Sequence, residues 1–482
     1  MARSFPGLRI EFPDLLGLGL IAGVIAPSAA NADVVISSDT TQNMTCSAGT
    51  CVPTATDAVL NVSDLENMLA AGNLIVATAG SGVDAQNIDV EAGFSWSTSN
   101  SLSLDASSYM HVDSEIGSSA AAGLSLVTAA EVPVKDLFFG RHGRVVFQNT
   151  SSQFSINGTP YTLVNNISSL ASAIASNPSG SFALADNYDA SADGTYSNSP
   201  ITTTFTGSFD GLGNEISHLS IRHSGSAAYI GLFTVVLAPG TAEHVRLARV
   251  QITGTSDGDG DLIGALAGGG AGYLFQNSAT GTIRLRGTSG LAGGLVGQAD
   301  GDIDTCFAHV TIDASKAKGN STSGGLVGGG GPIIDSFASG DVIAGNYNNA
   351  GGLVGADARV ENSYSTGSVS GGVNARVGGL TGTNNEHGIT AVYSTGAVSG
   401  GSPSYVGGFA GKNEPSVKGG YWDTDTSGTT QAVGKGSARG VTGLTTQQLQ
   451  SGLPRGFDSS VWGEKESINN GLPYLLANPP VE

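Results

Sequence analysis

Two short runs of aspartate contain the first residues in the sequence that could do chemistry. Each run places a carboxylate at every second position, a spacing that can aim several carboxylates at one hard cation such as calcium. Neither run continues into the glycine and bidentate glutamate of an EF-hand-type loop, and acidic residues are common in turns between strands. We therefore expect solvated loops, keep calcium as the alternative, and expect no other cofactor. The six residues are Asp257, Asp259, Asp261, Asp300, Asp302 and Asp304.

A second group of carboxylates is the densest in the chain: Asp186, Asp189, Asp193 and Asp210. Paired carboxylates act as the acid and the base of glycoside hydrolysis, and some polysaccharide-cleaving enzymes are β-helical. The first three lie in a turn-like sequence of Tyr, Asp, Ala, Ser and Gly, and Asp210 precedes Gly211, so both contexts favour Asx-type turns. We expect structural roles for these residues, with a secreted carbohydrate-active enzyme as the alternative.

Other catalytic signatures are missing from the sequence. The seven histidines are scattered, and the zinc-protease, nucleophile-elbow and phosphate-loop motifs do not occur. Cys46 and Cys51 bracket a short loop, which in an exported chain favours a local disulfide over a metal site. Cys306 is then unpaired, and we expect a buried structural cysteine because no histidine and acid can be assigned to it. The sequence predicts no catalytic residue and no enzyme.

A glycine-flanked apolar residue recurs along the second half of the chain and indicates the scaffold that positions these side chains. The pattern is spelled Gly-Gly-Leu-Val-Gly in its clearest copies, and the central residues lie 27 to 31 positions apart. An interval of this length is typical of one coil of a solenoid. The central residues are Leu266, Leu295, Leu326, Leu353, Leu380 and Phe409.

An aromatic series shares the phase of the leucine series, with intervals of 27 to 30 positions. Two series in one phase predict an all-β, right-handed parallel β-helix with short capping helices. We expect leucines and rings to stack in one internal column, and the flanking glycines to allow positive φ and close approach of neighbouring coils. The aromatic residues are Phe307, Phe337, Tyr364, Tyr393 and Tyr421.

Composition and charge restrict the function. Glycine contributes 73 of 482 residues, charged residues make up only 12%, and the formal net charge is −20. Such a charge repels phosphate backbones, so we expect no nucleic-acid partner. Arg3 and Arg9, a short apolar run and the sequence Ala-Asn-Ala ending at residue 32 predict a cleaved export signal, and we expect no membrane-spanning segment in the mature chain.

The sequence divides into five predicted segments. A signal peptide over 1–32 precedes a β-helical region over 33–150 with one helix, which we expect Ser63 to cap and Gly72 to end. A connecting segment over 151–204 contains a short helix at 166–176. The glycine-rich repeat solenoid follows over 205–440, and a cap over 441–482 begins with a short helix near residues 444–449.

Two parts of the chain resemble known families. The Gly-Gly-Leu-Val-Gly copies, followed by Asn-Ser-Tyr-Ser-Thr-Gly at 362–367, resemble the GLUG repeat family of large bacterial surface proteins over residues 205–440, and the flanking sequences at 205–216 and 421–428 are similar to that family too. Residues 33–150 more loosely resemble the secretion domain of filamentous haemagglutinin-like proteins through residues 71–74, 94–96 and 101–106, although the Asn-Pro turn motifs of that domain are missing.

These resemblances imply a secreted or bacterial cell-surface protein with an adhesin-like, non-enzymatic function. The haemagglutinin-like region implies export through an outer-membrane transporter of the two-partner type. The receptor stays open among host-cell, glycan and matrix partners. The alternatives are a carbohydrate-active enzyme on the same scaffold and an inert structural component of an envelope or matrix.

Overall fold

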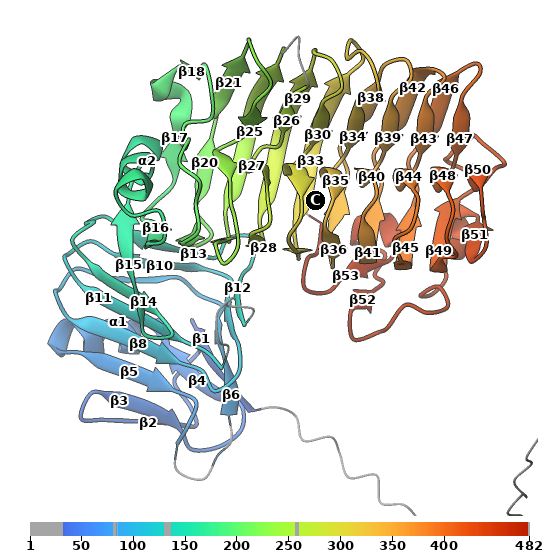
Figure 1. Ribbon diagram of the computed structural model, residues 1–482. Helices are drawn as coiled ribbons and strands as arrows, with labels where there is room; N and C mark the ends of the chain where they lie inside the picture. Colours follow the sequence, from blue (N-terminus) through green and yellow to red (C-terminus); the bar gives the residue numbers. More distant parts are fainter. Residues whose placement is uncertain (1–31, 81–82, 84, 130–135, 256–259, 481–482) are drawn as a thin grey trace, which may run out of the picture.

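Short parallel strands dominate the computed structural model, which describes residues 32–80, 83, 85–129, 136–255 and 260–480. The strands form a right-handed β-solenoid of about 12 turns. An N-terminal body (blue) lies below one end of a longer rod (green to red), as Figure 1 shows. The predicted all-β parallel β-helix is confirmed. The predicted signal peptide lies outside the described residues apart from Ala32, so it stays a prediction.

The N-terminal body is built from three parallel stacks of strands. The first contains β4 Ala58–Asn61, β1 Ala32–Ser37, β6 Ala85–Val90, β9 Met110–Val112 and β12 Leu137–Phe139. The second contains β7 Phe94–Trp96, β10 Glu115–Ser118 and β13 Arg144–Phe147. The third contains β3 Thr50–Pro53, β5 Leu74–Ala77, β8 Ser101–Asp105, β11 Gly123–Val127 and β14 Gln153–Ile156, and β2 Met44–Ser47 pairs antiparallel with β3.

Helix α1, Val62–Ala71, closes part of this body. Asn61 ends β4 in an extended conformation, and its side chain accepts hydrogen bonds from the amides of Ser63 and Asp64. The predicted cap, Ser63, was therefore wrong, because the extended backbone of Asn61 places the side-chain Oδ1 of Asn61 over the free amides. The buried residues Leu65 and Leu69 join the core of the N-terminal body.

The β14–β15 hairpin joins the body to the rod. Strand β15, Thr159–Val164, pairs antiparallel with β14 and then parallel with β16, Ser181–Leu184. Asn157 and Gly158 make the tight turn with positive φ values of 48° and 76°. Helix α2, Ile167–Ser176, follows; it is capped by Asn166 and buries Ile167, Leu170 and Ile174 against the first coils of the rod.

The rod has three faces of parallel strands. One face contains β22 Tyr229–Ile230, β26 Leu262–Ile263, β30 Leu291–Gly293, β34 Thr322–Gly324, β39 Asn349–Gly351, β43 Arg376–Gly378 and β47 Tyr405–Gly407. The next contains β23 Phe233–Val235, β27 Ala267–Gly270, β31 Val296–Ala299, β35 Val327–Gly330, β40 Val354–Ala356, β44 Thr381–Asn384, β48 Ala410–Asn413 and β50 Val433–Gly436.

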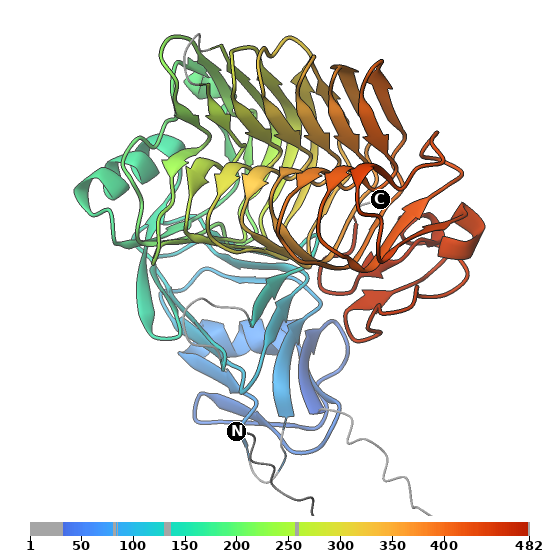
Figure 2. The same cartoon turned by 45° about the vertical axis from the view of Figure 1, so that its right-hand side comes forward.

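The third face of the rod is the widest, and its strands run in two rows. The first row contains β16, β19 Ser208–Asp210, β24 Thr241–Glu243, β28 Tyr273–Phe275, β32 Ile303–Asp304, β36 Pro332–Ile334, β41 Arg359–Ser365, β45 Ile389–Ser394, β49 Lys418–Asp423 and β51 Val441–Leu444. The second contains β17 Tyr188–Asp189, β18 Thr195–Tyr196, β20 Glu215–Ser217, β21 Ser220–His223, β25 Arg246–Gly254, β29 Ser278–Leu285, β33 Phe307–Ala314, β37 Phe337–Ala338, β38 Val342–Ala344, β42 Val369–Val373 and β46 Val398–Gly401. Figure 2 shows these strands stacked in rows along the rod.

The Gly-Gly-Leu-Val-Gly copies form the corner between the first two faces. Leu326 donates its amide proton to the carbonyl oxygen of Leu353 at 2.9 Å, and Leu353 donates to Leu380 at 2.9 Å, so each leucine stacks on the next. All six central residues are fully buried in the core of the rod. A Cβ on Gly352 would lie 2.0 Å from the carbonyl oxygen of Gly379. The predicted close approach is confirmed, but the predicted positive φ was wrong, since these glycines have no positive φ and the corner is made by ordinary backbone.

The aromatic series lies on the opposite side of its strands from the leucine core. Rings of Phe307, Phe337, Tyr364 and Tyr393 stack at centroid distances of 4.9 to 5.1 Å with interplanar angles of 4°. Phe337, Tyr364 and Tyr393 belong to a separate buried cluster that also contains Tyr421, and the partly buried Phe307 packs against it. The prediction of one internal column was wrong, because the period of a repeat fixes the coil position of a side chain and leaves open the face to which it points.

The C-terminal strap, residues 445–480, covers this aromatic ladder. Its helix α3, Thr446–Leu449, is capped by Thr445, and its short strands β52, Trp462–Gly463, and β53, Tyr474–Leu475, pair antiparallel. Figures 1 and 2 show the strap (red) lying against the side of the rod. The side-chain amide of Asn478 donates to the carbonyl oxygen of Cys306 at 3.1 Å, so the strap runs back along several coils.

Candidate functional site

Three ionisable side chains meet where the N-terminal body joins the rod. Asp210 ends β19, and Glu243 ends β24 one coil later, where the two residues are paired in register. His244 follows with a φ of 55°. All three residues are at most 1% exposed, and each offers an oxygen or nitrogen atom within 4.8 Å of the others. We call these residues the junction cluster.

Hydrogen bonds fix the imidazole of His244 in the junction cluster. Its Nε2 lies 2.9 Å from the carbonyl oxygen of Leu137 in β12, and its Nδ1 lies 3.0 and 3.1 Å from the two carboxylate oxygens of Asp210. Asp210 also accepts a hydrogen bond from the amide of Leu212 at 2.7 Å, the Asx-type turn that the sequence predicts. The rings of Phe139 and Phe275 pack against the imidazole at centroid distances of 4.9 and 5.6 Å.

The electrostatics of the junction cluster follow from this enclosure. Burial raises the pKa of Glu243 to about 7, and the charge of Asp210 adds to the effect. Burial alone would lower the pKa of His244, but the charge of Asp210 and the hydrogen bond to it raise that pKa above its ordinary value. The cluster can therefore hold a cation, and its enclosure keeps a large substrate away from all three groups.

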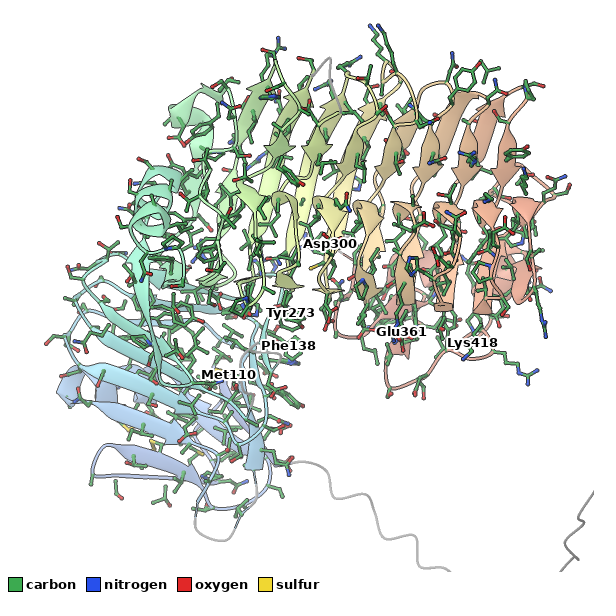
Figure 3. All side chains as sticks on the ribbon, in the orientation of Figure 1. Met110, Phe138, Tyr273, Asp300, Glu361 and Lys418 are labelled. Atoms are coloured by element: carbon green, nitrogen blue, oxygen red, sulfur yellow. A yellow bond between two sulfur atoms is a disulfide. The ribbon has the colours of Figure 1, made fainter. Side chains whose placement is uncertain are left out.

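The same junction is held by polar contacts between the rod and the backbone of the N-terminal body. The side-chain amide of Gln276 accepts from the amide of Phe139 at 2.9 Å and donates to its carbonyl oxygen at 3.3 Å, as a neighbouring strand would. Arg246 donates to the carbonyl oxygen of Gly140 at 2.6 Å. Figure 3 labels Phe138 and Tyr273, which mark this corner on its two sides.

A depression of about 400 Å³ lies on the N-terminal body beside α1. Glu66 and Ala70 line it from the helix, and Trp96 and Glu115 line it from β7 and β10. Trp96 is only 5% exposed, and hydroxyl, amide and carboxylate groups supply about half of the lining surface. Arg144 donates two hydrogen bonds, at 2.6 and 3.0 Å, to the Oε2 atom of Glu115. The depression is suited to hydrogen bonding with a polar ligand.

The aspartate runs are arranged differently from a calcium loop. Asp257 and Asp259 lie outside the described residues, and Asp261 is buried with Oδ1 accepting from the amide of Ala228 at 3.1 Å. Asp300 is exposed in the loop after β31, where Figure 3 labels it, whereas Asp304 is buried and accepts from the hydroxyl of Tyr273 at 2.9 Å. Over the part of the chain that the structure describes, the junction cluster alone brings together three side chains whose possible metal-ligand atoms lie within 4.8 Å of one another, and neither aspartate run does. Asp302 is partly buried between the other two members of its run.

The four acid and base candidates do not gather at one place. Asp189 accepts from the amide of Ser191 at 2.9 Å and lies 2.8 Å from Nδ1 of His218. These hydrogen bonds, first that of the Ser191 backbone, lower the pKa of Asp189 to about 2. Asp193 accepts from the hydroxyl of Tyr196 at 2.7 Å. Asp186 is exposed, and Asp210 is enclosed in the junction cluster.

The cysteines have the structural roles that the sequence predicts. Cys46 and Cys51 form a disulfide across the β2–β3 hairpin. Cys306 is buried, its Sγ accepts from the amide of Asn277 at 3.3 Å, and its own amide donates to the hydroxyl of Ser336 at 2.9 Å. Burial raises the pKa of Cys306 to about 12, so its thiol is a poor nucleophile. No helix among the described residues is long and apolar enough to cross a membrane.

Glu243 and His244 were missed by the sequence interpretation. The signal for them was one of register: the segment 242–244 occupies, one coil later, the position of 209–211. Their partner Leu137 lies more than a hundred positions earlier, and no repeat relates it to them.

Comparisons with known proteins give one family motif and one partial relative. Residues 346–370 match the GLUG motif, so this part of the predicted resemblance is confirmed. Halomucin of Haloquadratum walsbyi is 38% identical over 96 residues, which make up 20% of this chain and 1% of Halomucin. The chain thus spans a very small part of this relative.

One solved structure shows a weak overall likeness. It is a Bacteroides ovatus protein described as "a putative immunoglobulin A1 protease", with 18% identity and a TM-score of 0.39 over 66% of this chain and 93% of that one. Nothing about function is carried over from a likeness at this level. The comparisons therefore identify a GLUG motif within the rod, at residues 346–370.

Proposed function

We propose that this chain is a secreted or cell-surface, non-enzymatic β-solenoid of adhesin type that attaches to a glycan, a host cell or a matrix. The observation that carries the proposal is the dispersal of carboxylates over a rod with a filled core. Asp189 and Asp193 are engaged in surface turns, and Asp210 is enclosed. Catalysis needs such groups to converge beside an accessible substrate, whereas attachment needs a stable, extended surface.

A surface location is supported by the GLUG motif and by the partial likeness to Halomucin. The strongly negative composition, with a formal net charge of −20, also suits a protein that stays soluble in a crowded exterior. Fractionation of the source cells tests this part. We expect the chain in the medium or on the outer surface, where added protease reaches it, and a chain found only inside intact cells would contradict the proposal.

The route of export is part of the proposal. The parallel coils of residues 32–156 suit the haemagglutinin-type secretion domain that the sequence resembles. Such a domain implies an outer-membrane transporter of the two-partner type. We expect more full-length chain outside cells when such a transporter is present, and equal amounts with and without it would argue against this route.

The depression beside α1 is the proposed receptor site. Its hydroxyl, amide and carboxylate lining matches the hydrogen-bonding groups of a sugar. Ala70 lines the depression from the exposed side of α1, whereas the neighbouring Ala71 is exposed outside it. The variant Ala70→Trp would fill the depression, and Ala71→Trp adds the same ring beside it.

A glycan array and a cell-binding assay with the mature chain test this site. We expect binding by the wild type and by Ala71→Trp, and at least a tenfold loss for Ala70→Trp, since a filled pocket costs about 1.4 kcal/mol or more. Equal binding by both variants would exclude the depression. Release of sugar would favour the enzyme alternative, and no binding to any surface would favour an inert matrix component.

A further inference from the structure

The protonation state of His244 shows that a positive charge belongs in the junction cluster. A carbonyl oxygen can only accept, so the contact with Leu137 places a proton on Nε2 of His244. In a neutral ring, Nδ1 then carries a lone pair, which faces both carboxylate oxygens of Asp210. Facing lone pairs at 3.0 Å repel each other, so either a proton or a metal ion must lie between them.

Glu243 distinguishes these two solutions. Its Oε2 atom is buried and has no hydrogen-bond partner. A buried carboxylate oxygen without a partner is costly, and most such atoms in folded proteins are satisfied. A proton shared by His244 and Asp210 leaves Oε2 of Glu243 without a partner. A metal ion bound by all three side chains would satisfy it.

The separation of His244 and Asp210 suits a metal ion as well, and Glu243 offers a carboxylate oxygen within 4.8 Å of both. Two ligand atoms that each lie about 2.0 to 2.2 Å from one ion are about 2.8 to 3.6 Å apart at octahedral or tetrahedral angles. The separations of 3.0 and 3.1 Å between His244 and Asp210 lie within that range. A ring nitrogen that donates to a backbone carbonyl, as Nε2 does to Leu137, is the usual support of a metal-binding histidine.

We propose that Asp210, Glu243 and His244 bind one divalent first-row metal ion of the zinc class at the junction between the N-terminal body and the rod. One imidazole and two carboxylates are a ligand set that zinc accepts. The site is structural, because its residues are enclosed and leave no path for a substrate. The ion would fix the His244 ring and, through Leu137, hold β12 of the N-terminal body on the rod.

Metal content and thermal unfolding of the mature chain test the proposal. The chain is stripped with EDTA, reloaded with Zn²⁺, and passed over a desalting column before its zinc is measured by mass spectrometry. We expect one zinc per chain and a melting temperature several degrees above that of the stripped form, since a ligand of the folded state stabilises it. In Glu243→Gln, which keeps the size of the side chain, both effects should be lost.

Glu215→Gln and His218→Gln are matched controls on the surface of the same part of the rod, and both should bind zinc as the wild type does. The proposal is overturned if the wild type retains no zinc, or if Glu243→Gln retains as much as the wild type. Should that variant fail to fold, X-ray absorption of the zinc-loaded wild type decides. One imidazole with carboxylate oxygens supports the site, and several imidazoles or water alone overturn it.

Discussion

The N-terminal body and the rod are both stacks of parallel coils, but only the rod repeats one glycine-flanked leucine corner from coil to coil. In the first stack of the body, Val34, Ile88, Met110 and Leu137 follow one another in register, so the side chain changes from coil to coil. Like residues stack in its third stack, where Leu102 pairs with Leu74 and Leu124, but no glycine pattern flanks them. In the rod, leucine stacks on leucine at the glycine corner. Identical stacking lets every coil use one geometry, and it makes each coil depend on the same few positions.

The glycines of the leucine corner show one consequence of this repetition. A Cβ on Gly117 in the N-terminal body would lie 3.3 Å from the Cβ of Ser95, a contact that a small shift relieves. A Cβ on Gly352 in the rod would lie 2.0 Å from a backbone oxygen, which cannot move without separating the coils. The rod repeats this backbone contact in coil after coil, whereas in the body so close a contact occurs at single positions such as Gly143, where a Cβ would lie 1.5 Å from the carbonyl oxygen of Val112.

The largest expected effect is that of Gly352→Ala. We expect a loss of about 3 to 5 kcal/mol in the free energy of unfolding of the rod, because the new Cβ forces neighbouring coils apart. Gly117→Ala should cost less than about 1 kcal/mol. Gly388→Ala is the control within the rod, since nothing lies within 4 Å of its Cβ position. Urea unfolding followed by hydrogen exchange of each region measures this, and equal losses for Gly352 and Gly388 would break the comparison.

The next effect concerns the strap, which the N-terminal body lacks. Trp462 packs against Tyr364 and Tyr393 at 6.0 Å and against Phe457 at 4.4 Å. We expect Trp462→Ala to cost about 3 to 5 kcal/mol locally and to release the strap. Limited proteolysis should then cut residues 445–480 first and leave the N-terminal body intact. Uniform cleavage of both regions would show that the strap is not a separate layer.

Two tyrosines of the aromatic ladder, Tyr393 and Tyr364, test the attachment of the strap through single hydroxyl groups. The hydroxyl of Tyr393 donates to the carbonyl oxygen of Pro473 at 2.6 Å and accepts from Asn469 at 2.8 Å, whereas the hydroxyl of Tyr364 is buried without a partner. Tyr393→Phe should destabilise the strap by about 1 to 3 kcal/mol, and Tyr364→Phe should be neutral or slightly stabilising. Thermal melts of the two variants measure this, and the reverse order would contradict the hydrogen-bond assignment.

The smallest effect is a pH dependence in the N-terminal body. Burial, followed by the charges of Asp33, Asp113 and Glu91, raises the pKa of Asp89 to about 6. A carboxyl with a raised pKa in the folded state loses stability as pH rises from about 4 to about 6, because the folded state holds its proton longer. Asp89→Asn should therefore melt higher than the wild type near neutral pH and equally near about pH 4. A constant difference at all pH values would exclude this cause.

The sequence predicted the rod better than the parts that touch it. The leucines could be found because Leu295, Leu326 and Leu353 recur with one neighbour pattern, and a recurring pattern in a solenoid means stacking. The face of the aromatic ladder could not be predicted, since neighbouring residues of one strand both pack in apolar layers: Ala308 is buried in the rod core, and Phe307 packs against the separate aromatic cluster. The layer that buries the rings comes from a strap with no repeat of its own.

The junction cluster was out of reach for a related reason. Asp210 was singled out, but its partners follow only when the coil register is known, and this register sets Glu243 opposite it. The contact of His244 with Leu137 joins the rod to the N-terminal body, and no sequence repeat relates these two residues. The two helices were found from apolar spacing, yet the cap of α1 was misplaced, since Asn61 and Ser63 are both good capping residues by type.

Attachment without turnover is the central claim, and product analysis tests it most directly. The mature chain is incubated with a polysaccharide that it retains in a binding assay, and the size distribution and reducing ends of the polysaccharide are followed over a day. We predict bound polysaccharide of unchanged length and no increase in reducing ends. Shortened chains, or reducing ends that rise in proportion to the amount of protein, would contradict the claim and restore the carbohydrate-active enzyme.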